Sequence, residues 1–415
     1  MRSDLAEPRR WRATGLVAAL LLVALAALAG CSHEVSIRPP KPPQDVAASR
    51  ADAAQQALDT LRRAIATGRP APDLAAPGAA ALVPQILRNA AALRVRHVSL
   101  DYLDANLGVP SRAQAARFGA GAWVASVQIS YRIPEDTGAT HMEAAFTFVP
   151  GRRTATIAAI GGHGERSPLW MRGSLQVRRT ARTLVLDAGP GSPAPYVRLA
   201  KHAVRDVNLV LPRWRGRLVI EVPASEGELD SVLDAQRATY ANIAAVTTTV
   251  DGSTIRGAPV HVFLNPSVFG TLKTKGAQVV VSHETTHVAT NAPFAQMPTW
   301  LLEGFADYVA LDHAGVPVQT AAAQILARIR KHGLPHGLPT ATDLEPTAGG
   351  LGATYEEAWL ACHYLGATYG EAKLVAFYRA VDHGMSLSAA FRNIVGVSQA
   401  QFVAGWRQDL ARLAG

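Results

Sequence analysis

The chain has 415 residues, of which 48% are hydrophobic, 18% are charged and two are cysteines. This length exceeds what one hydrophobic core usually fills, so we expect two domains in addition to processing segments. The formal charge of +9 at pH 7 is not arranged in a basic stripe interleaved with aromatic residues, so the composition argues against a nucleic-acid partner.

The first thirty residues have the pattern of an export signal. Several arginines precede an apolar run from Ala13 to Ala29, and the run ends in Leu-Ala-Gly-Cys at residues 28–31. This tetrapeptide resembles the lipobox of bacterial lipoproteins, whose cysteine becomes the lipidated first residue of the mature chain. We therefore predict a signal peptide over residues 1–30 and a lipid anchor at Cys31 on the extracytoplasmic face of a bacterial cell membrane. An uncleaved membrane anchor is the alternative, because the run is about long enough to span a bilayer.

Residues 31–48 contain four closely spaced prolines, a composition typical of a stiff extended spacer. Helices are predicted from Val46 to Thr67 and from Pro84 to Leu93 by the spacing of apolar residues and by the turn residues around them. Segments with strand character follow at residues 95–103, 123–133, 144–149, 154–160, 175–178 and 183–186. Several of these alternate apolar and polar residues, which is typical of an antiparallel sheet with one buried face.

Helices followed by a meander of strands predict an α+β domain over residues 49–190. This pattern is similar to the cone-shaped nuclear-transport-factor-like domain of many exported lipoproteins, although no motif carries the resemblance. The family implies a cone with a pocket. A ligand-binding role and a role as a spacer or docking module both stay open, because a fold alone does not establish a function.

A second domain is predicted over residues 191–415, with its boundary in the proline-rich segment 190–195. Its first part contains a helix at 196–211, strands at 217–222, 242–249 and 259–264, and a helix opened by a capping box of Ser225 and Glu228. Its second part is helical, with helices predicted at 319–331, 354–367 and 371–381 and a last helix from Ser398, where Gln401 completes a capping box. The sequence therefore predicts a mostly helical domain with a small mixed sheet.

Residues 283–287 read His-Glu-Thr-Thr-His, the most specific motif of the chain. On a helix, residues four apart share a face, so His283 and His287 can point at one ion, whereas on a strand they would be roughly 13 Å apart. A catalytic zinc ion takes three protein ligands and keeps one position for water. Glu303 is the candidate third ligand, and Glu284 would lie beside the metal without binding it.

A second helix is predicted to carry Glu303, because Pro298 precedes an amphipathic segment from Thr299 to Leu311. Asp307 follows Glu303 by four residues and shares its face. Metal-bound histidines usually donate their other ring proton to a carboxylate, so Asp307 is the candidate partner of a histidine ligand.

These two motifs resemble the gluzincin clan of zinc peptidases, the relatives of thermolysin and the aminopeptidases, in which a second helix supplies a glutamate ligand. The resemblance covers roughly residues 260–370. It implies a zincin-type metallopeptidase domain with one zinc ion held by His283, His287 and Glu303, and with Glu284 as the general base. Fifteen residues separate His287 from Glu303, fewer than in thermolysin. The matching residues of the second motif are Trp300, Leu301, Glu303, Gly304, Ala306 and Tyr308.

The family also implies a hydrogen-bond donor for the substrate oxyanion and an edge strand that pairs with an extended peptide. By position the donor would be Tyr355, with His363 as a fallback, and the edge strand would be Val260 to Leu264. The chain has other histidines without ligand spacing, which we expect to be ordinary surface or core residues: His97, His163, His202, His261 and His313. Cys362 has no disulfide partner if Cys31 is lipidated, and we expect it to be a buried small hydrophobe.

The predicted function is hydrolysis of peptide bonds in a peptide or protein substrate by metal-activated water. Two alternatives stay open. One is a zinc-containing but catalytically silent binding lipoprotein, and the other is an envelope assembly factor that uses the spacer and the basic face of the protein to dock.

Overall fold

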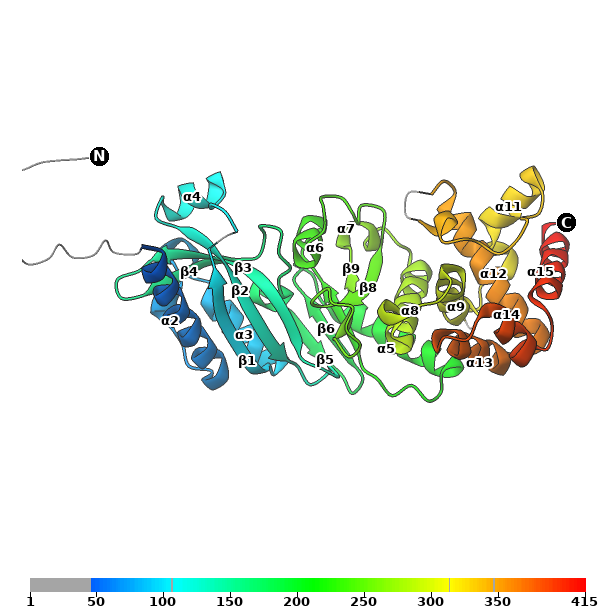
Figure 1. Ribbon diagram of the computed structural model, residues 1–415, viewed down its shortest axis with the longest axis horizontal. Coiled ribbons are helices and arrows are strands. Elements are labelled where there is room, and N and C mark those ends of the chain that lie inside the picture. Colours follow the sequence, from blue (N-terminus) through cyan, green and yellow to red (C-terminus); the bar gives the residue numbers. More distant parts are fainter. Residues whose placement is uncertain (1–45, 106, 313, 346–347) are drawn as a thin grey trace, which may run out of the picture. The chain divides into compact units, whose positions relative to one another are not determined.

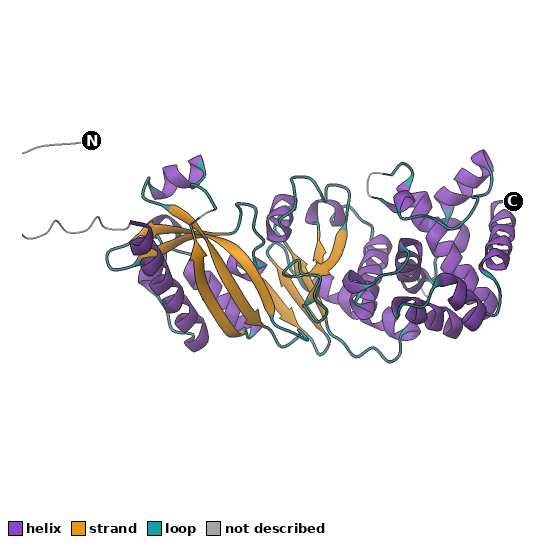
Figure 2. Ribbon diagram, viewed as in Figure 1, coloured by secondary structure: helices purple, strands orange, loops and turns teal. Residues whose placement is uncertain are grey.

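The computed structural model describes residues 46–105, 107–312, 314–345 and 348–415. The predicted signal peptide, the lipidation site Cys31 and most of the spacer therefore lie outside the described residues. Residues 46–415 form one compact unit with two β-sheets and many helices, so the fold class is α+β as predicted (Figures 1 and 2). In the described ranges, no helix is both long and apolar enough to cross a membrane.

The first sheet is a four-stranded antiparallel meander with its strands in chain order. Alternate residues of the second strand, from Trp123 to Tyr131, share a hydrophobic core with Leu58, Leu61 and Ile86 of the two preceding helices. The predicted antiparallel meander is thus confirmed. The opposite face is buried in part as well, since Val124, Ser126 and Thr147 are at most 4% exposed. The elements are α2 Val46–Thr67, α3 Leu82–Leu93, β1 Arg96–Asp104, α4 Arg112–Phe118, β2 Trp123–Arg132, β3 Thr140–Pro150 and β4 Ala155–Ile160.

Helix α4 was missed by the sequence analysis although its start carries a recognisable signal. Ser111 accepts a hydrogen bond from the backbone N–H of Gln114, and the Gln114 side chain accepts one from the N–H of Ser111. This is a complete capping box. The short length of the helix, seven residues, is the reason that apolar spacing could not reveal it.

The second sheet has the strand order β5-β6-β7-β9-β8. Its three inner strands are parallel, and the two outer strands run antiparallel to their neighbours. The strands are β5 Gln176–Arg179, β6 Thr183–Asp187, β7 Leu218–Val222, β8 Ala245–Thr249 and β9 Val260–Leu264.

Two strands that we expected in the first meander belong to the second sheet instead. The predicted segments 175–178 and 183–186 correspond to β5 and β6, and β6 pairs in parallel with β7. Apolar alternation is a local property that does not reveal which strand is the partner, which is why the sequence analysis misplaced them. The domain boundary near residue 190 stays a prediction, although it falls directly after two strands of the second sheet.

The expectation that Val260 to Leu264 forms the sheet edge is wrong. This segment is β9, which lies between β7 and β8, and four of its five residues are buried. The edge strand beside β9 is β8, in which three of five residues are only partly buried. A nearly continuous apolar strand is typical of an inner parallel strand, because helices or another layer cover both of its faces.

Both faces of the second sheet are covered. Helix α5 (Ala194–Val210) connects the parallel strands β6 and β7 and packs beside α8 (Thr274–Thr290), and these helices share a core with Val185, Ile220 and Val262 of the strands. Residues of the opposite face, among them Leu186 and Phe263, belong to the core of the first sheet. The covered sheet holds α8 in place, and α8 carries the histidine motif.

Helix α6 packs into the core of the first sheet, and α7 packs into the core that α5 and α8 share. The helices from α9 onward pack around a third core, in which α9 and α12 contact each other closely. The capping box of Ser398 and Gln401 is present, whereas the Glu228 side chain accepts from the N–H of Ala224 and not from that of Ser225. The bounds of these helices are α6 Glu226–Leu233, α7 Pro266–Phe269, α9 Thr299–Leu311, α10 Val318–Ala321, α11 Ala323–His332, α12 Leu351–Tyr369, α13 Glu371–Asp382, α14 Leu387–Ala390 and α15 Gln399–Ala414.

Gly304 permits the close approach of α9 to α12. A Cβ atom at this position would clash with the carbonyl oxygen of Ala358 and would lie 3.1 Å from Cys362 Sγ. We expect Gly304→Ala to lower the free energy of unfolding by about 1–3 kcal/mol, because the backbone of α12 has to move. Gly276→Ala in α8 is the matched control, since nothing lies within 4 Å of its added Cβ. Urea unfolding of both variants measures the effect, and equal stabilities would contradict the close approach.

A buried charged cluster joins the turn between β2 and β3 to the second sheet. His261 of β9 is 2% exposed, and its ring nitrogens lie 2.6 Å from Glu221 Oε1 and 2.9 Å from Asp136 Oδ1. Burial lowers the pKa of His261, but the charges and hydrogen bonds of Asp136 and Glu221 outweigh it and raise the pKa to about 10. His261 is therefore not an ordinary core histidine, because it carries the positive charge that two buried carboxylates need.

We expect His261→Gln to destabilise the protein by about 3–5 kcal/mol at pH 6.5, because it leaves two buried carboxylates without a cation. The folded-state pKa of His261 is above its unfolded value, so this stabilisation is complete below the unfolded pKa and disappears as the pH rises through about 10. The gap between parent and variant in urea unfolding should therefore shrink between pH 6.5 and pH 10.5. The exposed His202→Gln serves as the control, and a gap independent of pH would contradict the assignment.

Candidate metal centre

Helix α8 places the two histidines of the motif on one face, as predicted. The helix runs through residues 274–290 and ends where Asn291 adopts the left-handed conformation, with φ of 53°. The Nε2 atoms of His283 and His287 lie 3.0 Å apart. Each ring therefore directs its Nε2 atom toward the same position between the two side chains.

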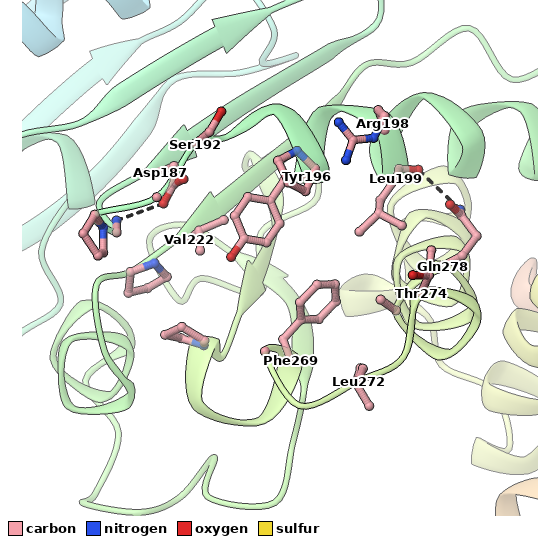
Figure 3. A pocket seen from close by; sticks show the side chains of 18 of the residues that line it. Asp187, Ser192, Tyr196, Arg198, Leu199, Val222, Phe269, Leu272, Thr274 and Gln278 are labelled. Atoms are coloured by element: carbon pink, nitrogen blue, oxygen red, sulfur yellow. Dashed lines mark hydrogen bonds between the residues drawn. The ribbon is translucent and has the colours of Figure 1, made fainter.

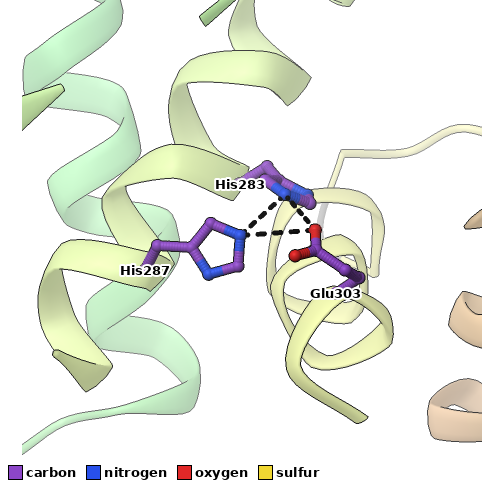
Figure 4. A group of neighbouring side chains, drawn as sticks. All are labelled: His283, His287 and Glu303. Carbon is purple, nitrogen blue, oxygen red and sulfur yellow. Dashed lines mark hydrogen bonds and ion pairs between the residues drawn. The ribbon is translucent and has the colours of Figure 1, made fainter. Parts of the chain in front are cut away.

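Helix α9 brings Glu303 to this point. The helix spans the predicted range Thr299–Leu311 and begins directly after Pro298. Glu303 Oε2 lies 3.2 Å from His283 Nε2 and 3.4 Å from His287 Nε2 (Figure 4). The possible ligand atoms of the three residues all lie within 4.8 Å of one another.

The spacing of these three atoms fits a zinc ion. Two zinc–ligand bonds of about 2.0–2.1 Å at a tetrahedral angle separate the ligand atoms by roughly 3.3 Å. The observed separations of 3.0, 3.2 and 3.4 Å are close to this value. Two imidazoles and one carboxylate are also a donor set that catalytic zinc sites use, so the residues present fit the metal.

The charges of His283, His287 and Glu303 affect one another's protonation. Burial lowers the pKa of His283, but Asp307 and then Glu303 raise it well above its ordinary value. Burial raises the pKa of Glu303, whereas the imidazoles of His287 and His283 more than reverse this and lower it. The carboxylate thus requires positive charge beside it, which either protons on the imidazoles or a metal ion can supply.

Asp307 contacts the first histidine on the side away from the cluster. Its Oδ1 lies 2.7 Å from His283 Nδ1. The sequence predicted a histidine ligand as the partner of Asp307, and the structure shows that this histidine is His283. Donation from Nδ1–H to this carboxylate leaves the Nε2 lone pair free to bind a metal. His287 Nδ1 is buried and has no hydrogen-bond partner in the described part of the chain. Of the two histidines, His283 is thus the one whose ring is held by a carboxylate.

Glu284 points toward the edge strand of the second sheet. It is 8% exposed, and its Oε2 accepts a 2.6 Å hydrogen bond from the hydroxyl of Thr247 in β8. The same hydroxyl lies 3.1 Å from the Glu284 carbonyl oxygen. Thr247 was not among the predicted site residues, because no local pattern indicates which residue of a distant strand will contact a helix. The three consecutive threonines of β8 were nevertheless a signal for a polar edge strand.

Tyr355 lies near the cluster, on α12. Burial first, and then the charges of Glu303, Asp307 and Glu284, raise the pKa of this phenol above its ordinary value. A phenol with a raised pKa stays protonated and can donate a hydrogen bond. The fallback residue His363 contacts a different carboxylate, because its Nδ1 lies 3.3 Å from Asp312 Oδ1.

None of the other histidines that the structure describes joins the cluster. His97 and His202 are exposed, His163 lies 3.2 Å from Gln114, and His313 is outside the described residues. Cys362 is fully buried, as expected, and its thiol pKa is raised by burial and by the charge of Asp307. Across the described ranges, His283, His287 and Glu303 are the group of His, Cys, Asp or Glu side chains with the convergence that a metal ion requires.

Comparisons with known proteins do not assign the chain to a family. No family model matches the sequence, and no curated protein matches it. A solved structure of a mutant two-domain M1 zinc metallopeptidase bound to L-tryptophan is weakly similar, with 16% identity and a TM-score of 0.31. The match covers 69% of this chain and 61% of the other chain.

Proposed function

We propose that the chain is a zinc-dependent peptidase tethered by a lipid at Cys31 to the outer face of a bacterial cell membrane. The observation that carries the enzymatic part is the convergence of His283, His287 and Glu303 beside Glu284. The membrane anchor is supported by the lipobox-like sequence at residues 28–31 alone.

His283, His287 and Glu303 would hold one zinc ion, which when bound would lower the pKa of a water molecule towards about 7 and polarise a substrate carbonyl group. Glu284 would accept the proton of that water. Thr247 holds one oxygen of the Glu284 carboxylate by its 2.6 Å hydrogen bond, which leaves the other oxygen for the proton. Tyr355 would donate a hydrogen bond to the developing oxyanion of the substrate, because its raised pKa keeps the phenol protonated.

The edge strand β8 would bind the substrate. Its outer side has no strand neighbour in the described sheet, so an extended peptide can add to it through backbone hydrogen bonds. Thr247 lies in this strand and contacts Glu284, so a peptide along β8 would pass beside the proposed general base.

Hydrolysis of a diverse peptide library by the zinc-loaded protein tests the proposal. We expect cleavage that stops when a chelator removes zinc and returns when zinc is added. A protein that holds zinc and cleaves no peptide would instead be a silent zinc-binding protein.

A further inference from the structure

A cavity of about 800 Å³ lies at the carboxyl ends of the parallel strands of the second sheet. Its walls come from the ends of β6 and β7, from helix α7, which follows β9, and from the first turns of α5 and α8 (Figure 3). No residue of the metal cluster lines it. In open α/β sheets this is the place where ligands bind, and the volume is in the range of pockets that enclose a small molecule.

One end of the cavity carries a buried acid that has no basic partner among the described residues. Asp187 is the last residue of β6 and is 2% exposed. One of its carboxylate oxygens accepts a 2.9 Å hydrogen bond from the N–H of Gly189, and within the described ranges no Lys, Arg or His pairs with it. Buried charges are normally paired, so the carboxylate is suited to a cationic or N–H donor group of a ligand.

Basic side chains also line the cavity. In Figure 3, Asp187 and Ser192 lie on one side of Tyr196, and Arg198 lies on the other side, beside Leu199. Lys275 and His202 are further lining residues, and all three basic side chains are exposed. The negative charge of Asp187 and the positive charge of Arg198 are therefore separated along the cavity.

An aromatic pair lies between the two ends. The rings of Tyr196 and Phe269 have centroids 6.0 Å apart, and Leu199 and Leu272 line the cavity beside them. Burial and then the charge of Asp187 raise the pKa of Tyr196, so its phenol stays protonated and can donate a hydrogen bond to a ligand. The middle of the cavity therefore suits an apolar group.

We propose that this cavity is a second binding site, independent of the metal cluster, for a short apolar peptide with free termini. The peptide ammonium group binds Asp187, apolar side chains pack on Tyr196 and Phe269, and the terminal carboxylate lies toward Arg198 and Lys275. An anionic amphiphile would leave Asp187 without a cation, and a simple cation would be repelled by the basic side chains. A ligand with both charges and an apolar body matches the whole cavity.

Isothermal titration calorimetry of the full chain with the dipeptide Leu-Phe tests this site. The titrations are made in the Glu303→Ala background, which disables the metal cluster and prevents hydrolysis, and are repeated with the parent. We expect binding in both proteins. N-acetyl-Leu-Phe and the amide of Leu-Phe should each bind about 10- to 100-fold more weakly, because each lacks one charged terminus.

Two variants identify which residue of the cavity binds each terminus of the peptide. Asp187→Asn should weaken Leu-Phe binding by the same factor as acetylation and leave the acetylated peptide unaffected. Arg198→Ala should weaken Leu-Phe but not its amide. Arg198 is exposed, so we expect Arg198→Ala to fold. It therefore tests whether the peptide binds in this cavity even if circular dichroism shows that Asp187→Asn does not fold.

Three results would overturn the site: no heat of binding at millimolar Leu-Phe, equal affinity for the acetylated peptide, or binding that the parent shows and the Glu303→Ala background loses. The last result would place the peptide at the metal cluster. It would thus refute the cavity proposal while supporting the peptidase proposal, and the two proposals can fail separately.

Discussion

Replacing Glu303 with alanine is expected to abolish zinc binding. The purified parent should hold about one zinc ion per chain after mild dialysis, and the variant should bind zinc more than about 100-fold more weakly. The physical reason is that Glu303 supplies both a ligand atom and the negative charge that lies 3.2 and 3.4 Å from the two histidines. Even the loss of a residue that only orients a ligand typically reduces metal affinity 10- to 100-fold.

Two further variants make this measurement specific. Glu345→Ala removes an exposed glutamate and should leave the zinc content unchanged. Asp307→Ala removes the partner of His283 Nδ1 and should weaken zinc binding by about 10- to 100-fold, less than the loss of Glu303. Elemental analysis and a zinc-dependent shift of the melting temperature both report the outcome. A parent that holds no zinc under metal-replete conditions would show that the cluster is not a metal site.

Replacing Glu284 with glutamine is expected to preserve zinc and abolish hydrolysis. Glutamine keeps the shape and can still accept the hydrogen bond from Thr247, which is 2.6 Å long in the parent. It cannot accept a proton from water, so kcat should fall by about 10²- to 10⁴-fold. Cleavage rates over the peptide library, measured beside the zinc content of each preparation, test this expectation.

The control for Glu284 is Glu345→Gln, which should be as active as the parent. A Glu284→Gln variant with full activity would remove Glu284 from the mechanism, whatever the zinc content. A parent with one zinc ion and no detectable cleavage would favour the silent zinc-binding protein. A variant that loses both zinc and activity would show instead that Glu284 supports the metal site.

Most helices and strands could be predicted from the sequence because their signals are local. Helix α2 has the predicted bounds Val46–Thr67, and α9 has the predicted bounds Thr299–Leu311. The spacing of His283 and His287 on α8 required only the periodicity of a helix. Glu303 and Asp307 could be named for a similar reason, since they are four residues apart on one helix face.

The sequence by itself thus determined the local elements, the α+β class and the residues able to bind a metal. Only the tertiary structure decided that β8 and not β9 is the sheet edge, that β5 and β6 join the second sheet, and that Thr247 contacts Glu284. The same holds for the partners of His261 and for the cavity at Asp187. The reason is physical: helix and strand patterns depend on neighbours along the chain, whereas strand order and buried polar contacts depend on residues brought together from distant positions.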